Sequence, residues 1–387
     1  MINRAAQRYL TMSVDKISYH MGIMVRMQKT IYLFAFIIGL SLPVAAQETA
    51  VNYTDARELM IIGKAAPTIN TFQRLDSAQF AAMPKVVKAL CLNSSGIAVL
   101  FETNSPVIRA KWTLAKKGYY PNMTPIAHSG LDLYAWKNKQ WQYVSVGKPN
   151  EGTLQDQVII NNMDATMKQF MLYLPLYNTV TDLQIGVMKG AVIKKPSIPQ
   201  IDMRKRIVVY GSSVVQGAAA SRPGMPYPAI IQRKTGYDVI NLGFSGSAKM
   251  EIELAKYLAT VPADCYILDC IPNPSPEEIK ERAYPFIKYL REHQQNTPII
   301  IVETIIRENG YWDKTVGDRV SKQNEEINKV YNQLLKEGMK NIYYIAAKDL
   351  IGNDHETTID GIHLTDVGFT RMSNALLPVL QKALRSK

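Results

Sequence analysis

Three residues whose types suit nucleophilic chemistry stand just beyond, or between, apolar segments of the chain. Ser213 follows the apolar run 207–210, and Asp360-Gly-Ile-His363 lies near the carboxyl terminus. An Asp three residues before a His, with a Gly between them, can fold back so that its carboxylate orients the imidazole. Histidine titrates near neutrality and can take the proton of a serine hydroxyl. Ser213, His363 and Asp360 are therefore candidates for a nucleophile, a base and an orienting acid.

Two other segments carry groups that can bind a developing oxyanion. Asn241-Leu-Gly-Phe-Ser-Gly246 ends in a glycine whose backbone N–H can approach a substrate, and Asn273 offers an uncharged amide donor. Each group alone has a plainer interpretation: a Gly-Ser turn, a loop glycine, an Asx turn before a helix, or a surface histidine. Their combination is what acyl transfer by a serine hydrolase requires.

The second half of the chain alternates short apolar runs with helical patterns. The runs are 207–210, 239–242, 266–268, 299–302 and 342–345, and the helical patterns are 251–260, 276–294, 318–337 and 366–384. Such alternation predicts a parallel sheet covered by helices on both faces. Ligands bind beyond the carboxyl ends of the strands in such sheets, so the candidate residues should meet at one rim.

The first half has a strand-like pattern instead. Short β-branched or aromatic runs occur at 97–101, 107–112, 131–136, 141–144, 170–174 and 183–187. Several short strands at this spacing predict an antiparallel sandwich or jelly roll. Its aromatic residues are interpreted as core and cross-strand pairs rather than as a sugar-stacking platform. The segment 193–205 carries two prolines and a Lys-Lys pair, which favours a linker.

The first residues of the chain resemble a targeting signal. Arg26 and Lys29 precede an apolar stretch at 31–42, and Pro43-Val-Ala-Ala46 supplies small residues for cleavage. Met27 is then a possible true start, and an uncleaved anchor is the alternative. We expect a leader at 1–46, a sandwich at 47–192, a linker at 193–205 and a catalytic domain at 206–387. The mature protein should be exported to the periplasm or beyond, without a membrane span.

The formal charge of +12 does not point to a nucleic-acid partner. Five of the 45 Lys and Arg residues precede Gln47, and no basic-aromatic repeat or zinc-finger spacing follows. The three cysteines show no metal-ligand spacing, and Cys265 and Cys270 are too far apart along one strand to pair. Buried free thiols are expected, and the sequence does not indicate an oligomeric state.

Residues 204–387 resemble the SGNH, or GDSL-like, hydrolases. The first family block, Gly-Asp-Ser with a Gly four residues after the Ser, corresponds to Gly211-Ser-Ser213 and Gly217, which makes Ser213 the nucleophile. Ser212 stands where the family usually has Asp. The other blocks fall on Gly246, Asn273, Asp360 and His363. In the third block, Pro272-Asn-Pro274 replaces the usual Gly-Asn-Asp.

The resemblance extends to a two-domain subgroup with an amino-terminal β-sandwich, through 172–177, 219–228 and 241–246. It implies a flavodoxin-like three-layer α/β domain with a five-stranded parallel sheet, preceded by an antiparallel, jelly-roll-like β-sandwich. It also implies an oxyanion hole formed by Ser213, Gly246 and Asn273. Many such exported proteins are carbohydrate esterases, so an acylated carbohydrate or another small ester is the implied substrate. The implied reaction needs no metal and no organic cofactor.

Three further residues are candidates for substrate contacts. Tyr311 and Trp312 lie in the loop after the run 299–302, which is either a lid with a sugar-stacking edge or an exposed connection. Arg222 can contact substrate or serve as a structural ion-pair partner. Thioesterases and lipases use the same catalytic residues, and a non-catalytic carbohydrate-binding protein would use only the sandwich.

Overall fold

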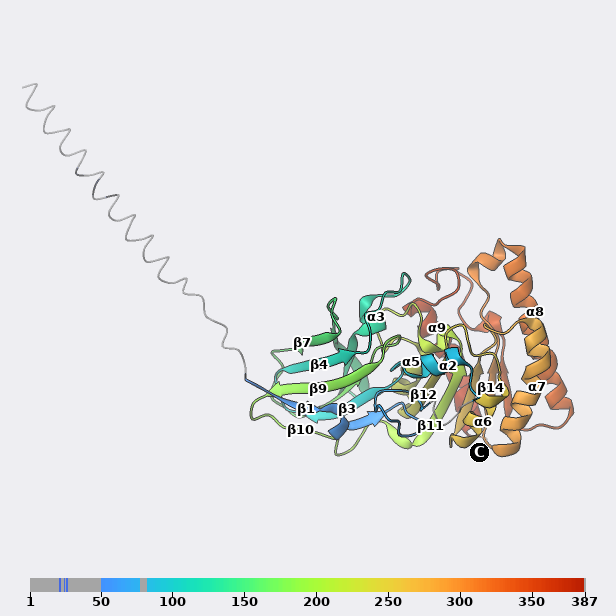
Figure 1. Ribbon diagram of the computed structural model, residues 1–387, viewed down its shortest axis with the longest axis horizontal. Helices are drawn as coiled ribbons and strands as arrows, with labels where there is room; N and C mark the ends of the chain where they lie inside the picture. Colours follow the sequence, from blue (N-terminus) through green and yellow to red (C-terminus); the bar gives the residue numbers. More distant parts are fainter. Residues whose placement is uncertain (1–20, 22–23, 25, 27–49, 77–81, 386–387) are drawn as a thin grey trace, which may run out of the picture. The chain divides into compact units, whose positions relative to one another are not determined.

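The computed structural model describes residues 50–76 and 82–385 together with Met21, Met24 and Arg26 (Figure 1). The expected leader at 1–46 lies almost wholly outside the described residues, so the signal peptide stays a prediction. Val51–Lys387 form one compact unit. Within this unit, the antiparallel strands lie at one end and the parallel sheet with its helices at the other (Figure 1).

Two antiparallel sheets form the first half. One has the order β1 (Val51–Asp55), β9 (Val180–Met188), β4 (Ile108–Leu114), β7 (Leu154–Ile160). The other has the order β10 (Ile193–Lys194), β3 (Ala98–Thr103), β8 (Lys168–Tyr173), β5 (Leu131–Lys137), β6 (Gln140–Gly147), with β2 (Met60–Ile62) also pairing with β3. The expected antiparallel sandwich is confirmed.

The second of these sheets is covered on both faces. Val99 and Phe101 of β3 face the core between the two sheets, whereas Ala98 and Leu100 join a cluster on the opposite face. That cluster also contains Ala229 of helix α5 (Tyr227–Thr235). Because successive side chains of a strand point to opposite faces, a doubly covered strand must be apolar throughout. The continuous apolar sequence of β3 follows from this position.

The second half is built on a five-stranded sheet. Its order is β12 (Tyr237–Gly243), β11 (Asp202–Gly211), β13 (Cys265–Asp269), β14 (Ile299–Val302), β15 (Ile342–Ile345), and all neighbours are parallel. This is the flavodoxin-like order, which confirms the predicted fold class. β11 begins within the segment 193–205 that was expected to be a linker, because Asp202 already pairs with Tyr237 of β12.

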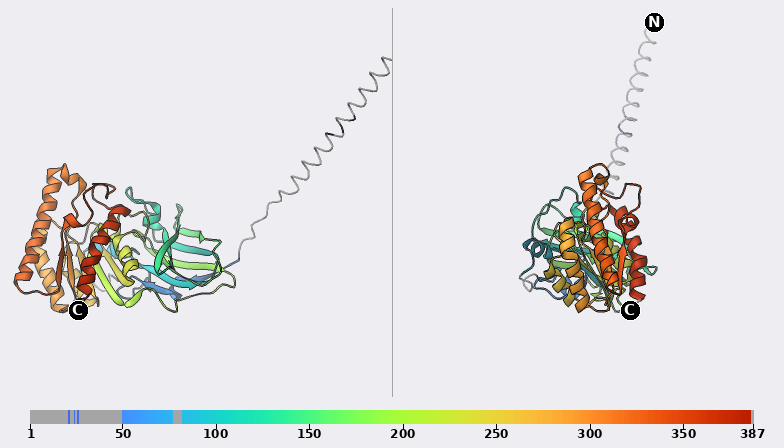
Figure 2. Two further views of the ribbon diagram at one scale, coloured as in Figure 1. Left: turned by 180° about the vertical axis from the view of Figure 1, so that it is seen from behind. Right: turned by 90° about the vertical axis from the view of Figure 1, so that its right-hand side faces the viewer.

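Helices cover both faces of the parallel sheet. One face carries α6 (Ile252–Thr260), α7 (Pro276–His293) and α8 (Lys314–Lys336), and the other carries α4 (Ser213–Gln216), α5 and α9 (Asp366–Arg385). Alternate residues of β11 divide accordingly: Val208 and Tyr210 face the first group, Ile207 and Val209 the second. In the left view of Figure 2, α9, in red, lies in front of the sheet.

The remaining short helices are α2 (Lys85–Cys91), α3 (Pro125–Ser129) and the 3-10 turns η1 (Ala56–Glu58), η3 (Glu308–Tyr311) and η4 (Ala347–Asp349). Helix α2 was not predicted. Its Val87 and Cys91 pack into the core of the parallel sheet, although α2 precedes most of the sandwich strands in the chain. The two halves therefore share a hydrophobic core.

Arg74, from the segment before α2, ties the same region to the parallel sheet. Its guanidinium is buried and donates hydrogen bonds to the carbonyl oxygens of Asn241 at 3.2 Å and Gly243 at 2.6 Å, at the end of β12. Two more bonds go to the carbonyl oxygens of Leu90 and Asn93. Burial lowers the pKa of Arg74 to about 10, so the side chain keeps its charge at neutral pH.

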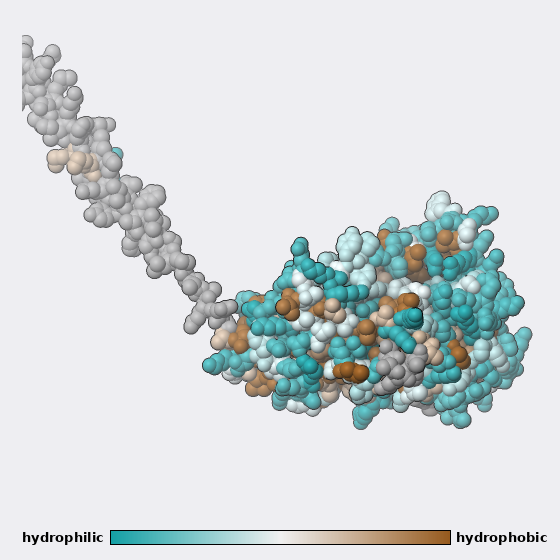
Figure 3. Space-filling model, viewed as in Figure 1, coloured by the Kyte–Doolittle hydropathy of each residue, from teal (hydrophilic) through white to brown (hydrophobic). Residues whose placement is uncertain are grey.

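The surface and the thiols agree with the composition. The face seen in Figure 3 is mostly hydrophilic, with apolar residues scattered over it. No helix in the described part of the chain is both long and apolar enough to cross a membrane. Cys91, Cys265 and Cys270 are buried, as predicted, and none of them forms a disulfide within the described part of the chain.

Candidate active site

The two adjacent serines after β11 have different surroundings. Ser212 is fully buried, and its hydroxyl oxygen accepts the N–H of Val214 at 3.3 Å, which caps α4. Ser213 is the first residue of α4, and its hydroxyl faces His363. Gly211 permits this turn, because a Cβ there would lie 2.2 Å from the carbonyl oxygen of Asp269 on β13. Of the two serines, Ser213 is the one whose hydroxyl reaches the histidine.

Asp360 and His363 lie in one loop before α9. Gly361 between them has a φ of +81°, which glycine adopts without strain. The backbone N–H groups of Ile362 and His363 donate to Oδ1 of Asp360 at 3.1 and 2.8 Å. Oδ2 lies 2.8 Å from Nδ1 of His363, and Nε2 of the same ring lies 3.0 Å from Oγ of Ser213. The loop thus folds back as the Asp-x-x-His spacing predicted.

The charge of Asp360 fixes the tautomer of this ring. Burial alone raises the pKa of Asp360, but hydrogen bonds from the His363 backbone, the His363 ring and Asn122 outweigh it and lower the pKa to about 2. The carboxylate is therefore ionised at neutral pH and can only accept hydrogen bonds. Nδ1 of His363 must carry the proton, which leaves Nε2 as an acceptor for the Ser213 hydroxyl.

Gly246 and Asn273 meet Ser213 and His363 around one cavity of about 240 Å³. Gly246 lies in the turn after β12 with a φ of +69°. The Asn273 amide fits this turn best with its oxygen 3.2 Å from the N–H groups of both Ser247 and Ala248. In that orientation both N–H groups of the turn donate to the Asn273 side-chain oxygen. The structure therefore brings together the four predicted residues, with Asp360 behind His363.

Two buried polar side chains hold the Gly246 turn against the serine helix. Gln216 of α4 accepts the N–H of Ser245 at 3.0 Å and donates to the carbonyl oxygen of Leu176, in the sandwich half, at 3.2 Å. Asn241 of β12 donates to the carbonyl oxygen of Val215 at 2.6 Å. Because Gln216 and Asn241 are almost fully buried, these bonds fix the relative positions of Ser213 and Gly246.

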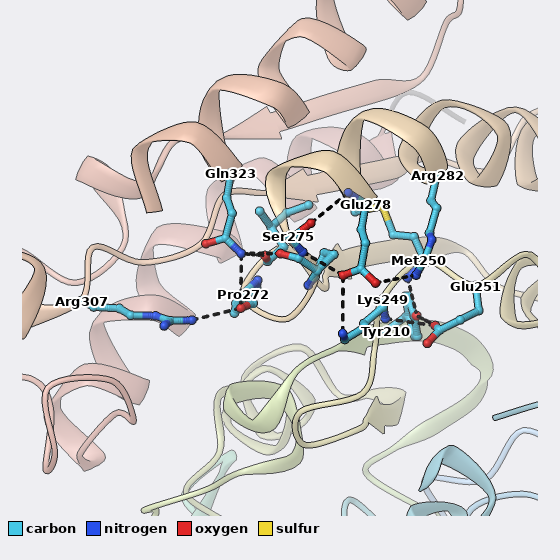
Figure 4. Close-up of polar contacts among 12 residues, drawn as sticks. Tyr210, Lys249, Met250, Glu251, Pro272, Ser275, Glu278, Arg282, Arg307 and Gln323 are labelled. Carbon is cyan, nitrogen blue, oxygen red and sulfur yellow. Dashed lines mark hydrogen bonds and ion pairs between the residues drawn. The ribbon is translucent and has the colours of Figure 1, made fainter. Parts of the chain in front are cut away.

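Side chains of α8 and of the segment after β14 hold the loop that carries Asn273 (Figure 4). Gln323 of α8 donates to the carbonyl oxygens of Ile271 at 3.0 Å and Pro274 at 2.6 Å. Arg307 donates to the carbonyl oxygen of Pro272 at 3.0 Å and also lines the cavity. The loop then ends in the predicted capping box, in which Ser275 and Glu278 bond each other's backbone N–H.

Tyr311 and Trp312 lie beside this cavity rather than in it. They line a separate hollow of about 630 Å³ with Glu308, Asn309 and His355. The segment that carries them is fixed to the catalytic loop, because the N–H of Glu308 donates to the carbonyl oxygen of Gly361 at 2.9 Å. The indole of Trp312 is 90% exposed and faces solvent.

Arg222 does not line the cavity of Ser213. It is an ion-pair partner of Asp132, on β5, with Nη1 3.0 and 2.8 Å from the two carboxylate oxygens. This contact corresponds to the structural alternative given above, and a role for Arg222 in substrate binding stays a prediction.

No pattern in the sequence indicated one of the residues at the site. Asn122, between β4 and α3 in the sandwich half, places its amide nitrogen 3.0 Å from Oδ2 of Asp360. The two residues are 238 positions apart, and no spacing rule connects them.

Family models match both halves of the chain. Residues 204–381 match the GDSL-like lipase/acylhydrolase family, and residues 51–193 match the amino-terminal region of SGNH-hydrolase-type esterases, described as GxDLY. The chain contains this pattern as Gly130-Leu-Asp-Leu-Tyr134, which includes the Asp132 that binds Arg222. This motif could have singled out Asp132, though not its partner Arg222, from the sequence.

Solved structures agree with the family models. A GDSL-like lipase from Bacteroides ovatus is 45% identical, with a TM-score of 0.84 over 87% of this chain and 98% of that chain. A family two carbohydrate esterase from Cellvibrio japonicus shares the fold at 13% identity, with a TM-score of 0.57 over 87% of this chain and 99% of that chain. An acetyl xylan esterase from the rumen bacterium Butyrivibrio proteoclasticus does so at 11% identity and a TM-score of 0.55, with the same coverage. A comparison with curated protein sequences found no match.

The protein belongs to the GDSL-like lipase/acylhydrolase family, as the resemblance implied, and is a carboxylic ester hydrolase.

Proposed function

We propose that the protein is an exported serine esterase that removes O-acyl groups, most of all O-acetyl groups, from carbohydrate. Ser213 is the nucleophile, His363 the general base and acid, and Asp360 the residue that orients the imidazole. The proposal rests above all on the contacts of 3.0 Å between Ser213 Oγ and His363 Nε2 and of 2.8 Å between His363 Nδ1 and Asp360 Oδ2.

The first half of the reaction acylates the serine. Ser213 Oγ attacks the ester carbonyl carbon while its proton passes to Nε2 of His363. The backbone N–H groups of Ser213 and Gly246 and the Asn273 amide stabilise the resulting oxyanion, and all three residues line the same cavity. The tetrahedral intermediate collapses, and the sugar oxygen leaves with the proton from Nε2.

The second half releases the acid. Water attacks the acyl-serine carbonyl carbon and gives a proton to Nε2, and a second tetrahedral intermediate forms at the same donors. The Ser213 oxygen departs, recovers the proton from Nε2, and leaves a carboxylic acid. Throughout, the anionic Asp360 stabilises the imidazolium and holds Nδ1 in its protonated form.

The size of the cavity supports a short acyl group. About 240 Å³ is below the roughly 300–1,000 Å³ of sites that enclose drug-sized ligands. An acetyl group and the reacting oxygen fit such a space, whereas a long acyl chain would need an additional apolar groove.

The neighbouring surface supports a carbohydrate as the alcohol part of the ester. Tyr311 and Trp312 offer exposed rings next to the loop of His363, and sugar rings stack on such surfaces. The acetyl xylan esterase and the family two carbohydrate esterases that share the fold act on substrates of this kind, as their names state. The leader-like pattern before Gln47 supports export.

A thioesterase or lipase is the second candidate. A cavity of about 420 Å³ adjoins the first and shares Arg307 with it. If this cavity takes an acyl chain, longer esters will be preferred over acetate.

A panel of substrates tests the proposal on the purified mature protein. Acetylated xylo-oligosaccharides, 4-nitrophenyl esters from acetate to decanoate, and an acyl-thioester are compared by kcat/KM. We expect the highest values for acetyl esters and a steep fall beyond butyrate. A maximum at octanoate or on the thioester would refute the acetyl-carbohydrate assignment.

The adjacent serines provide matched variants for the mechanism. Ser213→Ala should lower kcat by about 10⁴-fold or more, because triad members act as a unit. Ser212→Ala removes only the cap of α4 and should keep most of the activity. Full turnover by a folded Ser213→Ala protein, or equal losses in both variants, would overturn the nucleophile assignment.

A further inference from the structure

Asn122 reaches the catalytic loop from the opposite half of the molecule. Its amide nitrogen lies 3.0 Å from Oδ2 of Asp360 and 3.4 Å from Nδ1 of His363. The side chain is half-buried and belongs to the connection between β4 and α3, within the region matched by the family's amino-terminal model. A residue of the sandwich half therefore contacts the Asp–His pair directly.

Asn122 completes the hydrogen bonding of the carboxylate. Oδ1 of Asp360 accepts two backbone N–H groups, and Oδ2 accepts Nδ1 of His363 and Nδ2 of Asn122. Because Nδ1 and Nδ2 both donate to one oxygen, the 3.4 Å between them is the spacing of two donors and not a third bond. Each oxygen thus has two donors, so the carboxylate is held against rotation.

The loop that carries Asn122 is itself anchored on both sides. Thr124 caps α3 through the N–H of Ala127, and its hydroxyl also donates to the carbonyl oxygen of Ser221 at 2.6 Å. Tyr120 donates to the carbonyl oxygen of Tyr177 at 3.2 Å, and the two rings meet edge to face. The position of Asn122 is therefore set by one contact within the sandwich half and one contact with the catalytic half.

We infer that Asn122 is a positioning residue for catalysis and that the sandwich half supplies it to the active site. The inference rests on the proposed roles of Ser213, His363 and Asp360. The Asn122 amide fixes the plane of the Asp360 carboxylate, and so the direction in which the imidazole presents Nε2 to Ser213. By donating a hydrogen bond to Oδ2 of Asp360, the Asn122 amide also weakens the negative charge that this oxygen presents to Nδ1 of His363.

This second effect gives the inference a pH signature. The titratable and charged groups on the elements beside Asp360 and His363 include Arg307, which lines the same cavity as His363, and Asp366 at the start of α9. They also include the Glu308–His355 pair, whose Glu308 N–H donates to the carbonyl oxygen of Gly361. Without the Asn122 donor, Oδ2 stabilises the protonated imidazole more strongly. The acid limb of the kcat/KM profile then moves to higher pH, because a protonated His363 cannot accept the serine proton.

Two variants of the full-length mature protein test the inference with 4-nitrophenyl acetate. Asn122→Ala should lower kcat roughly 10- to 100-fold, as expected for a lost bond to a charged group, with little change in KM. Asn122→Asp has the same shape but adds a second anion beside Asp360. The acid limb of the kcat/KM profile should therefore lie at the lowest pH in the wild type, at a higher pH in Asn122→Ala and at the highest pH in Asn122→Asp.

Asn161→Ala, on an exposed loop of the sandwich, is the matched control and should leave the rate and the pH profile unchanged. A folded Asn122→Ala protein with wild-type kcat and an unmoved acid limb would overturn the inference. The inference would also be overturned if the loss of rate were fully explained by unfolding and the acid limb of the remaining activity stayed at its wild-type pH in both variants. If Ser213→Ala itself stays active, the proposed function fails first, and the two failures are distinguishable.

Discussion

Arg222 and Asp132 form an ion pair in which the carboxylate of Asp132 is completely shielded from solvent. Asp132 lies on β5 of the sandwich half, and Arg222 lies between α4 and α5 of the catalytic half. The same carboxylate accepts the N–H of Gly224 at 2.8 Å. The guanidinium also lies over the rings of Tyr134 and Tyr143. This pair fixes the start of α5 to the six-stranded sheet.

Breaking the pair on one side should therefore be costly. Arg222→Met removes the ion-pair partner of the buried Asp132 and leaves only the weaker influence of Arg233, so we expect the free energy of unfolding to fall by about 3–5 kcal/mol. Urea denaturation followed by circular dichroism measures this loss. Arg204→Met, which breaks an exposed pair with Asp202, is the control and should have little effect. Equal effects of the two changes would contradict the assigned role of Arg222.

Gln323 should affect catalysis through the loop of Asn273. Gln323→Leu keeps the volume of the buried side chain but removes the hydrogen bonds to the carbonyl oxygens of Ile271 and Pro274. We expect kcat on 4-nitrophenyl acetate to fall about tenfold, because the oxyanion donor is less well fixed. Gln333→Leu, on the exposed side of the same helix, is the control. A wild-type kcat for Gln323→Leu would show that the loop holds its position without this contact.

Asp269 predicts a pH dependence of stability. It is fully buried at the end of β13, and burial raises its pKa to about 8, although the Tyr227 hydroxyl donates to it at 2.9 Å and acts in the opposite direction. The folded protein therefore keeps a proton that the unfolded chain loses near pH 4. Stability should fall as the pH rises from about 4 to about 8, by at most about 1.4 kcal/mol per pH unit.

Asp269→Asn removes the titratable carboxyl group and keeps an oxygen atom that can accept the hydrogen bond from Tyr227. The variant should gain stability relative to the wild type progressively between pH 5 and 8, as measured by urea denaturation at each pH. Asp318→Asn, exposed on α8, serves as the control. A constant difference across this range would mean that Asp269 does not titrate there.

Trp312 should matter for oligosaccharides more than for small esters. Trp312→Ala removes an exposed ring beside the catalytic loop, and we expect KM for an acetylated oligosaccharide to rise about tenfold, as for a lost stacking contact. The ratio of kcat/KM between that substrate and 4-nitrophenyl acetate measures the effect. An unchanged ratio would place the glycan elsewhere on the surface.

The parallel half was largely predictable from its sequence. Its strands are buried on both faces, so they appear as short apolar runs, and α7 begins with a complete capping box at Ser275. The strand ends then led to the residues that meet around one cavity. Helix α5 was missed because six of its nine residues are buried, which leaves no clear polar face for a periodic pattern.

Strand β7 of the sandwich half was missed because it lies at a sheet edge, where five of its seven residues are at least partly solvent-accessible.

Contacts between the two halves could not be predicted from hydrophobic patterns. Asn122 and Arg74 act through single contacts between distant segments, and neither hydrophobic periodicity nor motif spacing records such contacts. These residues become visible only when both halves are folded together.

The buried guanidinium of Arg74 has a consequence for how such proteins diversify. Its bonds end on the carbonyl groups of Asn241 and Gly243, just before the turn that contains Gly246. A gene fusion that replaced the amino-terminal half with an unrelated module would leave these carbonyl groups without their donor and would open the core beneath them. The two halves should therefore be inherited together, and new substrate ranges should arise by changes in exposed loops rather than by exchange of domains.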